Sequence, residues 1–496
     1  MTAVLPSLLF SFAEKYAVLL VGMAASMLLS RLLSPAEVGL YALGAVLVTL
    51  AQVVRDFGVG QYLIQEKKLD RQKLRAALAA SMLVAWTLAL LVCLASFPLA
   101  AWYREVRLRS VLQLLSINFF LLPFAAVTLA MLRRQLRFRA IFAINVANAV
   151  VNMLVAVGLA LLGYSALSLV WAALAGNLAS VLMSLLLRPP GLPWLPAFKG
   201  LRAVLGFGAL SSGGSLLDEA GVAAPELVIG KLLDLSSLAL FGKAQSVLNL
   251  FNQAITSAVS PVIFPLFAAC ERESEAEQGH SKTMYLRTVS YMTALAWPFF
   301  LFLACAATPL IKLLYGEQWL ASASLIRIMC LPCAVYSMFS MVRHLLVASG
   351  QLRAQVRIDG WSALVKVALV LMAAPLGLQA VAGAVAASLL WRSWLSYRCL
   401  QRLQGINGAA LVASVRKSLA LCLICSPASL AMLLLPPGLS TLHCLLALAG
   451  AGLATLLCWL AGLLGLKHAL MTELLQLKQK YVGRAKPAAS KGEPCV

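Results

Sequence analysis

The chain has 496 residues, of which 62% are hydrophobic and only 12% are charged, and its mean hydropathy is +0.90. Soluble domains are about 45–50% apolar, so this composition excludes a soluble protein and indicates a polytopic membrane protein. The net charge of +22 is compatible with nucleic-acid binding, but the basic residues lie in short segments between apolar stretches, as the positive-inside bias predicts. We therefore expect no nucleic-acid partner.

Apolar stretches of about twenty residues, long enough to cross a bilayer, follow one another along the chain. In the first 200 residues they lie near 8–30, 38–64, 76–101, 108–131, 140–162 and 165–187. After a Pro-rich segment at 188–200 they lie near 205–230, 237–268, 284–313, 322–348, 356–376, 379–400, 411–435 and 440–465. The predicted fold class is an all-α integral membrane protein with about fourteen transmembrane helices.

An ungapped internal repeat relates residues 31–68 to the segment 200 positions later. Arg31, Tyr41 and Gln52 correspond to Lys231, Phe241 and Asn252, and such polar and aromatic matches carry weight because these residue types are rare in spans. We predict two pseudo-symmetric six-helix lobes, residues 1–200 (helices 1–6) and 201–405 (helices 7–12), around a central cavity. Helices 13 and 14 would occupy 406–466, and 467–496 would form a basic cytoplasmic tail.

Lysine and arginine are divided unequally between the two sets of loops. The loops after even-numbered spans and the C-terminal tail hold 27 of them, whereas the loops after odd-numbered spans hold 6. Because basic residues favour the cytoplasmic side, we predict that both termini are cytoplasmic and that the number of spans is even.

Patterns typical of enzymes are missing from the sequence. It has no Walker A loop, H-E-x-x-H motif or nucleophile elbow. The two C-x-x-C patterns, Cys330–Cys333 and Cys422–Cys425, lie in apolar stretches, where cysteine serves as a small packing residue. We expect no catalytic residues, no metal site and no enzymatic activity.

Polar side chains within spans are candidates for function because each is costly in hydrocarbon. The eighth span carries five on one helical face: Gln245, Asn249, Asn252, Gln253 and Thr256. In the repeat, the second span offers Thr49, Gln52 and Asp56. We interpret these residues as a hydrated cavity wall; the alternative is hydrogen bonding that joins helices.

Ionisable residues within spans form a second set of candidates. The cations are Lys15, Arg55, Lys243, Arg343 and Lys366, and the anions are Glu14, Asp56, Asp218, Glu219 and Glu226. Arg55 is near enough to the cytoplasmic end of its span to reach the interface, whereas Lys366 lies too deep in its span to reach either surface. It must face water, an anion or a carboxylate, and Asp359 would be a purely structural partner. Asp218 and Glu219 could pair with a cavity cation or bind a coupling proton or Na⁺. Pro225, which follows the glycines of the seventh span, is the expected hinge.

Three stretches resemble the signatures of the polysaccharide transporter family, within the multidrug/oligosaccharidyl-lipid/polysaccharide exporter superfamily. The first is Arg31-x-Leu-Ser-Pro35-x-x-x-Gly39-Leu-Tyr41 with Asp56-Phe-Gly58-Val-Gly60. The second is Ile229-Gly-Lys-Leu-Leu233 with Phe241-Gly-Lys-Ala244, and the third is Gly316-Glu-Gln-Trp319 with Ser349-Gly350. The resemblance covers about residues 8 to 405. It departs from the pattern at Leu235, where the first copy has proline, and at Ala239, where glycine is usual.

This resemblance implies a flippase of the bacterial inner (cytoplasmic) membrane that works by alternating access. Its substrate would be a polyprenyl-pyrophosphate-linked oligosaccharide, such as an exopolysaccharide, capsule or O-antigen (lipopolysaccharide) repeat unit, moved from the cytoplasmic to the periplasmic leaflet. Membrane lipids, a polysaccharide polymerase and glycosyltransferases are the other expected partners, and no cofactor is expected beyond a coupling H⁺ or Na⁺. The residues expected to bind the substrate are Lys15, Gln52, Asp56, Lys243, Asn249, Asn252, Gln253, Arg343 and Lys366.

Two other functions compete with this interpretation. An ion-coupled multidrug or small-solute exporter of the same superfamily would need an acidic, aromatic-lined cavity for cations, whereas the polar candidates here are mixed with a basic lean. A membrane-embedded glycosyltransferase or ligase would need a large outer loop to hold its two substrates, and the predicted outer loops are short.

Overall fold

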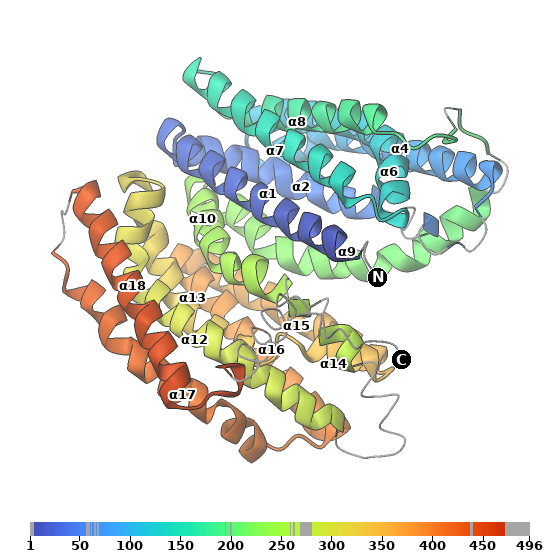
Figure 1. Cartoon of the computed structure of the whole chain (residues 1–496). Coiled ribbons are helices and arrows are strands. Elements are labelled where there is room, and N and C mark those ends of the chain that lie inside the picture. The colour runs from blue at the N-terminus through green and yellow to red at the C-terminus, as the bar shows by residue number, and fades with distance from the viewer. Residues whose placement is uncertain are drawn as a thin grey trace, which may run out of the picture. The chain divides into compact units, whose positions relative to one another are not determined.

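The computed structural model describes residues 4–55, 60, 62–63, 66, 69–193, 195–198, 201–257, 259–260, 263–267, 280–436 and 440–471. All regular structure in these ranges is helical (Figure 1). The α-helices are α1 (Val4–Leu32), α2 (Pro35–Arg55), α4 (Arg71–Tyr103), α5 (Arg107–Ser116), α6 (Asn118–Arg134), α7 (Phe138–Leu161), α8 (Leu167–Leu186), α9 (Leu201–Leu232), α10 (Leu235–Phe251), α12 (His280–Leu314), α13 (Ala321–Ser337), α14 (Val342–Ala348), α15 (Leu352–Ala373), α16 (Leu378–Gln404), α17 (Gly408–Leu430) and α18 (Thr441–Gly465).

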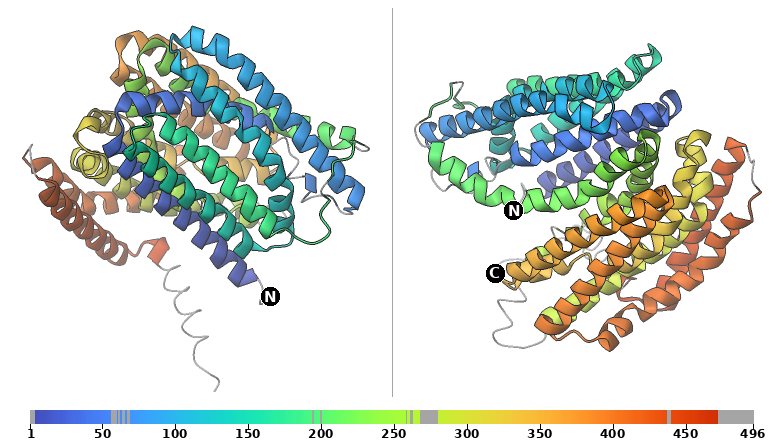
Figure 2. Two further views of the ribbon diagram at one scale, coloured as in Figure 1. Left: turned by 90° about the horizontal axis from the view of Figure 1, so that it is seen from above. Right: turned by 180° about the vertical axis from the view of Figure 1, so that it is seen from behind.

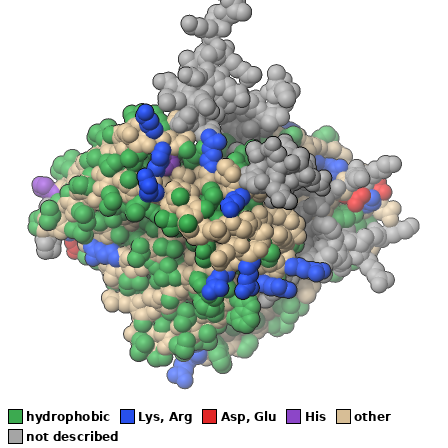
Figure 3. All heavy atoms as spheres, turned by 90° about the horizontal axis from the view of Figure 1, so that it is seen from below, with side chains coloured by type: hydrophobic (Ala, Val, Ile, Leu, Met, Phe, Trp, Pro, Cys, Tyr) green, Lys and Arg blue, Asp and Glu red, His purple; other side chains and the backbone are tan. Residues whose placement is uncertain are grey.

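These helices confirm the predicted membrane fold. Within the described ranges, eleven helical segments are long and apolar enough to cross a bilayer, and α9, α10 and α16 occupy the other three expected positions. Large hydrophobic side chains such as Leu90 and Leu154 are exposed on the outside, and Figure 3 shows hydrophobic side chains over much of one face. Such a surface suits lipid rather than water.

The chain forms two compact units. Unit 1 comprises the described parts of 1–258, 311–329 and 356–391, and unit 2 those of 259–310, 330–355 and 392–496. The chain passes between the units inside α12, α13, α15 and α16. Because these boundaries follow packing, they differ from the 200-residue division of the repeat, and the two six-helix lobes stay a prediction.

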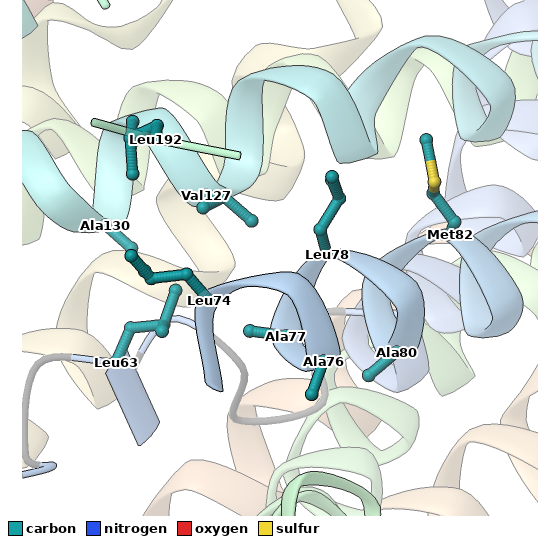
Figure 4. Close-up of a cluster of buried hydrophobic side chains, with 10 residues drawn as sticks. All are labelled: Leu63, Leu74, Ala76, Ala77, Leu78, Ala80, Met82, Val127, Ala130 and Leu192. Atoms are coloured by element: carbon teal, nitrogen blue, oxygen red, sulfur yellow. The ribbon is translucent and has the colours of Figure 1, made fainter. Parts of the chain in front are cut away.

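Small residues let helices of unit 1 approach closely. Figure 4 shows α4 against α6, where alanines of α4 alternate with leucines in one buried cluster. Its members are Leu63, Leu74, Ala76, Ala77, Leu78, Ala80, Met82, Val127, Ala130 and Leu192. Helices in lipid associate through such van der Waals packing, because burial against lipid tails gains little.

The two copies of the repeat begin their helices at equivalent positions, 35 and 235. In the first copy, Glu37 accepts a hydrogen bond from the Ser34 amide (2.8 Å) and Ser34 Oγ accepts one from the Glu37 amide (3.4 Å), which forms a capping box. In the second copy, Asp234 accepts from the amide (2.7 Å) and hydroxyl (2.9 Å) of Ser237. The change from proline to Leu235 therefore leaves the turn intact.

The two copies also pack against each other, α2 on α10. A Cβ atom built on Gly39 would lie 1.8 Å from the Leu235 carbonyl oxygen, so the two backbones touch there. At Gly230, on the neighbouring α9, a Cβ would lie 3.0 Å from the side chain of Leu43. Only glycine fits at position 39, because the obstacle is backbone and cannot rotate away.

We predict that Gly39→Ala lowers both the membrane abundance and the Tm of the purified protein, because α2 and α10 must separate to admit the methyl group. Overpacking of this kind costs about 1–3 kcal/mol. Gly242→Ala is the matched control: it lies on α10, and nothing lies within 4 Å of a Cβ there. Equal Tm values for the two variants would contradict a backbone contact at Gly39.

A buried polar cluster joins α12 to the C-terminal helices in unit 2. Thr293 Oγ1 donates to Ser418 Oγ (2.9 Å), and the Nε2 of His468 lies 3.2 Å from Ser290 Oγ and 3.4 Å from Ser418 Oγ. Burial, with a smaller contribution from Lys417, lowers the pKa of His468, which follows the last span. Its Nδ1 accepts the Leu470 amide hydrogen (3.2 Å), so the neutral ring fits this position.

Candidate functional site

Unit 1 contains a pocket of about 860 Å³. Its lining comes from α1, α7, α10, the π-helical turn Asn252–Thr256 that continues α10, and the end of α12. The polar lining residues are Glu14, Lys15, Tyr16, Ser26, Asn145, Asn148, Ser246, Asn249, Asn252, Gln253, Ser257 and Tyr315. A wall with five amide side chains and two charges can hold a polar molecule inside an otherwise apolar bundle.

The π-helical turn Asn252–Thr256 forms part of the pocket wall. It is wider than an α-helical turn, and Asn252 and Gln253 line the pocket together with Asn249. Gln245 and Thr256, which regular helical spacing places on the same face, are not part of the lining. The sequence could not reveal the change of helix type, which shifts the register by part of a turn.

The opposite face of the same segment packs into the protein. Leu248 and Phe251 are each only 5% exposed. The predicted division of this helix into an amide face and an apolar face is therefore present in the structure, although substrate binding by the amides stays a prediction.

Two amides of α7 belong to the pocket and were missed by the sequence analysis. Asn145 Nδ2 donates to Glu14 Oε1. Asn148 Nδ2 donates to Asn177 Oδ1 (3.2 Å), which in turn bonds onward to Asn118. Asn145 and Asn148 lie three residues apart in the fifth span, so the signal that reveals the eighth span also exists here.

Glu14 and Lys15 are the charged residues of the pocket lining. Although adjacent in sequence, they point to different partners: Glu14 to Asn145, and Lys15 Nζ to the Ser257 carbonyl (3.3 Å). The next side chain, Tyr16, donates its hydroxyl to the Ala254 carbonyl (3.2 Å). The start of α1 is thus fixed to carbonyls in and beside the π-helical turn.

Lys243 lies behind the part of the pocket wall formed by Ser26 and Tyr315, and it is only 9% exposed. Its ammonium donates to Ser26 Oγ (2.8 Å) and stands 4.5 Å from the centre of the Tyr315 ring and 5.1 Å from that of Trp319. A hydroxyl and two aromatic faces can stabilise a buried cation. Ser26 and Tyr315 line the pocket, so Lys243 adds positive potential there without being part of the wall.

Residues of the third signature stretch hydrogen-bond to the first stretch and to the end of α1, close to Lys243. Gln318 Nε2 donates to the carbonyls of Ser30 (2.6 Å) and Leu33 (3.1 Å), and Trp319 Nε1 donates to Ser30 (2.8 Å). These carbonyls belong to the last turn of α1, where helix carbonyls lack backbone partners. Together with Lys243 from the second stretch, these residues form what we term the signature junction.

An ion pair stiffens the loop that carries Gln318 and Trp319. Lys312 Nζ lies 2.8 Å from Glu317 Oε1. The hydrogen bond from Lys312 lowers the pKa of the Glu317 carboxyl, so this group stays ionised at neutral pH.

The remaining candidates lie outside the pocket lining. Gln52 is half-buried on α2, and Glu219 is half-buried on α9. Asp56 and the side chain of Asp218 lie outside the described residues.

The two other cations, Arg343 and Lys366, fall in different units. Arg343 is exposed on α14 in unit 2. Lys366 belongs to unit 1, where its Nζ donates to the Gly221 carbonyl of α9 at 3.0 Å.

The structure places both C-x-x-C patterns of the sequence inside helices. In the described parts of the chain, no group of three His, Cys, Asp or Glu side chains lies close enough to hold a metal ion. The C-x-x-C cysteines Cys330, Cys333, Cys422 and Cys425 are free thiols within α13 and α17.

The structure is thus an all-helical, multi-pass membrane bundle with an amide-lined pocket in unit 1. The sequence profile described as "Polysaccharide biosynthesis protein" matches residues 28–324. The chain belongs to this family, and its multi-pass membrane character agrees with that membership.

Two relatives illustrate the family. The teichuronic acid biosynthesis protein TuaB of Bacillus subtilis is 22% identical over 61% of this chain and 62% of its own length. The succinoglycan biosynthesis transport protein ExoT of Rhizobium meliloti is 25% identical over 62% of this chain and 63% of its own. The chain thus matches somewhat less than two thirds of the length of these relatives.

Two solved structures share the fold. The lipid II flippase MurJ in an inward closed conformation aligns with a TM-score of 0.70 at 13% identity, over 91% of this chain and 98% of that one. An inward-facing multidrug resistance MATE family transporter aligns with a TM-score of 0.57 at 16% identity, over 80% of this chain and 96% of that one. At such identities the likeness establishes the fold alone.

We predict that cysteines placed at positions 249, 252 and 253 react with a small, polar thiol reagent when the native cysteines have been replaced. These positions line the pocket, whereas Leu248 and Phe251 face the packed interior. Cysteines at 248 and 251 are the matched controls and should stay unmodified in the folded protein. Equal labelling of the two sets would show that the pocket wall is not hydrated.

Proposed function

We propose that this chain is a flippase that moves a polyprenyl-pyrophosphate-linked oligosaccharide from the cytoplasmic to the periplasmic leaflet of a bacterial inner membrane by alternating access. The observation that carries the proposal is the amide-lined pocket in a member of the polysaccharide biosynthesis family. The names of the relatives support it: one is called a transport protein of succinoglycan biosynthesis, and MurJ is called a lipid II flippase.

The amides suit the sugar part of such a substrate. A sugar head group cannot cross hydrocarbon unaided, because its hydroxyls would lose their hydrogen bonds, at a cost of about 2–7 kcal/mol each when nothing replaces them. Each of Asn145, Asn148, Asn249, Asn252 and Gln253 offers both a donor and an acceptor. A wall of this kind substitutes for water while the head group passes.

The cations suit the pyrophosphate part. Lys15 lies in the wall, and Lys243 lies behind Ser26 and Tyr315. Moving negative charge outward across an inside-negative membrane is downhill by about 2.3 kcal/mol per charge per 100 mV. Arg343, Asp218 and Glu219 stay candidates for head-group contact or for coupling to H⁺ or Na⁺, and a polymerase and glycosyltransferases would be functional partners.

The composition of the pocket favours this substrate over an organic cation. Among the residues of its lining, one carboxylate, Glu14, stands beside five amides and one lysine. An exporter of cationic drugs would need more negative charge, because desolvated cations require compensating anions.

We predict that the double variant Asn249→Ala/Asn252→Ala lowers export of the lipid-linked sugar about tenfold or more at unchanged membrane abundance. The loss of two hydrogen bonds between the pocket and the substrate, each worth roughly 1 kcal/mol, corresponds to a decrease in export of this size. Polymer production in a strain that lacks the native gene gives the readout. Gln245→Ala, on the same helix but outside the lining, is the matched control. Wild-type export by the double variant would remove the support for the pocket as the sugar site.

We also predict that reporter fusions after residues 70, 195 and 480 all give cytoplasmic signals. The division of 27 basic residues against 6 between the two sets of loops motivates this orientation. A cytoplasmic signal at 70 with a periplasmic signal at 480 would require an odd number of spans and would overturn it.

A further inference from the structure

A proline inside a helix leaves one carbonyl without its backbone partner. The proline nitrogen carries no hydrogen, so the carbonyl four residues earlier receives no hydrogen bond from it. In a membrane, that carbonyl needs a donor from elsewhere in the protein. Pro225 is buried within α9, and the carbonyl it leaves free is that of Gly221.

The donor at this carbonyl is Lys366, whose ammonium lies 3.0 Å from the Gly221 oxygen. The backbones come close here, since a Cβ on Gly221 would lie 3.0 Å from the Cβ of Ala363. Ala363 and Lys366 are three residues apart and share a face of α15. The close crossing of α9 and α15 at Gly221 therefore brings the lysine over the carbonyl.

The same arrangement recurs at one proline of unit 2. Trp459 Nε1 of α18 donates to the Ala294 carbonyl (2.9 Å), four residues before Pro298 of α12. The carbonyls that Pro225 and Pro298 leave without a backbone donor are thus both hydrogen-bonded to side chains of other helices.

We infer that Lys366 is a positioning residue that completes α9 at Pro225 and fixes this helix to α15, and that it is not a ligand of the transported head group. The charged donor makes this bond stronger than a neutral one. Figure 2 shows α9, the helix that holds Pro225, bending along its length, whereas the substitute donor Lys366 lies on α15. The inference concerns the protein without substrate and is independent of the proposed transport function.

A suppression experiment tests this role. Lys366→Met removes the donor and should lower the Tm of the purified protein by about 3 °C or more, because the buried carbonyl loses its partner. Adding Pro225→Ala supplies a backbone N–H to Gly221, so the double variant should regain most of the lost Tm. Lys366→Arg keeps a donor and should stay close to wild type.

Pro123→Ala in α6 is the matched control, because it removes a buried helix proline of unit 1 elsewhere; it should not rescue Lys366→Met. If Lys366→Met fails to accumulate in the membrane, the double variant with Pro225→Ala should accumulate, and its failure to do so overturns the inference. An unchanged Tm in Lys366→Met combined with lost export also overturns it and assigns Lys366 to the substrate. Because Tm is measured without transport, failure of the proposed function leaves this test intact.

Discussion

A peptide group inside a lipid bilayer has to find its hydrogen-bond partner within the protein, and this structure is built around that requirement. Within a helix, the backbone hydrogen bonds meet this requirement at almost every residue. At helix ends and at prolines, side chains donate the missing hydrogen bonds. Gln318 and Trp319 donate to carbonyls at the end of α1, and Lys366 donates to the Gly221 carbonyl, four residues before Pro225. Several residues that look expensive in a hydrophobic span are therefore part of the backbone's own hydrogen bonding.

The signature junction and the pocket wall are made of different residues. The junction donates hydrogen bonds to carbonyls at the end of α1 and surrounds a buried lysine. The amides that line the pocket, such as Asn145 and Asn249, lie outside the signature stretches. A change in one set of residues therefore leaves the other set in place.

Much of the fold could be predicted from the sequence because it depends on period and composition. Spans follow from runs of apolar residues, and the amide face of α10 follows from spacing. The repeat predicted that the turns before α2 and α10 correspond, and both helices do begin at equivalent positions. These features depend on residues that are close together in the sequence, or they repeat from one copy to the other. They can therefore be predicted without knowing which helices contact each other.

The remainder depends on contacts between distant segments. The sequence analysis did not select the amides of α7, because the sequence does not show that α7 packs against α1, beside which Asn145 and Asn148 line the pocket. The sequence shows the depth of Lys366 in α15, but it does not show the Gly221 carbonyl of α9 to which its Nζ donates. No residue pattern in this segment reveals the π-helical turn; Asn252 and Gln253 line the pocket as their spacing predicted, whereas Thr256 does not.

The passage of the chain between its two units inside α12 and α13 has a mechanical consequence. A loop would transmit almost no torque, whereas a continuous helix transmits force along its axis. Each of these helices carries a proline beside the crossing point: Pro309 is two residues before Ile311, and Pro332 is two residues after Cys330. The proline removes one backbone hydrogen bond and permits a kink. Of the four helices that cross between the units, α12 and α13 therefore have a proline beside the crossing, whereas α15 and α16 contain no proline.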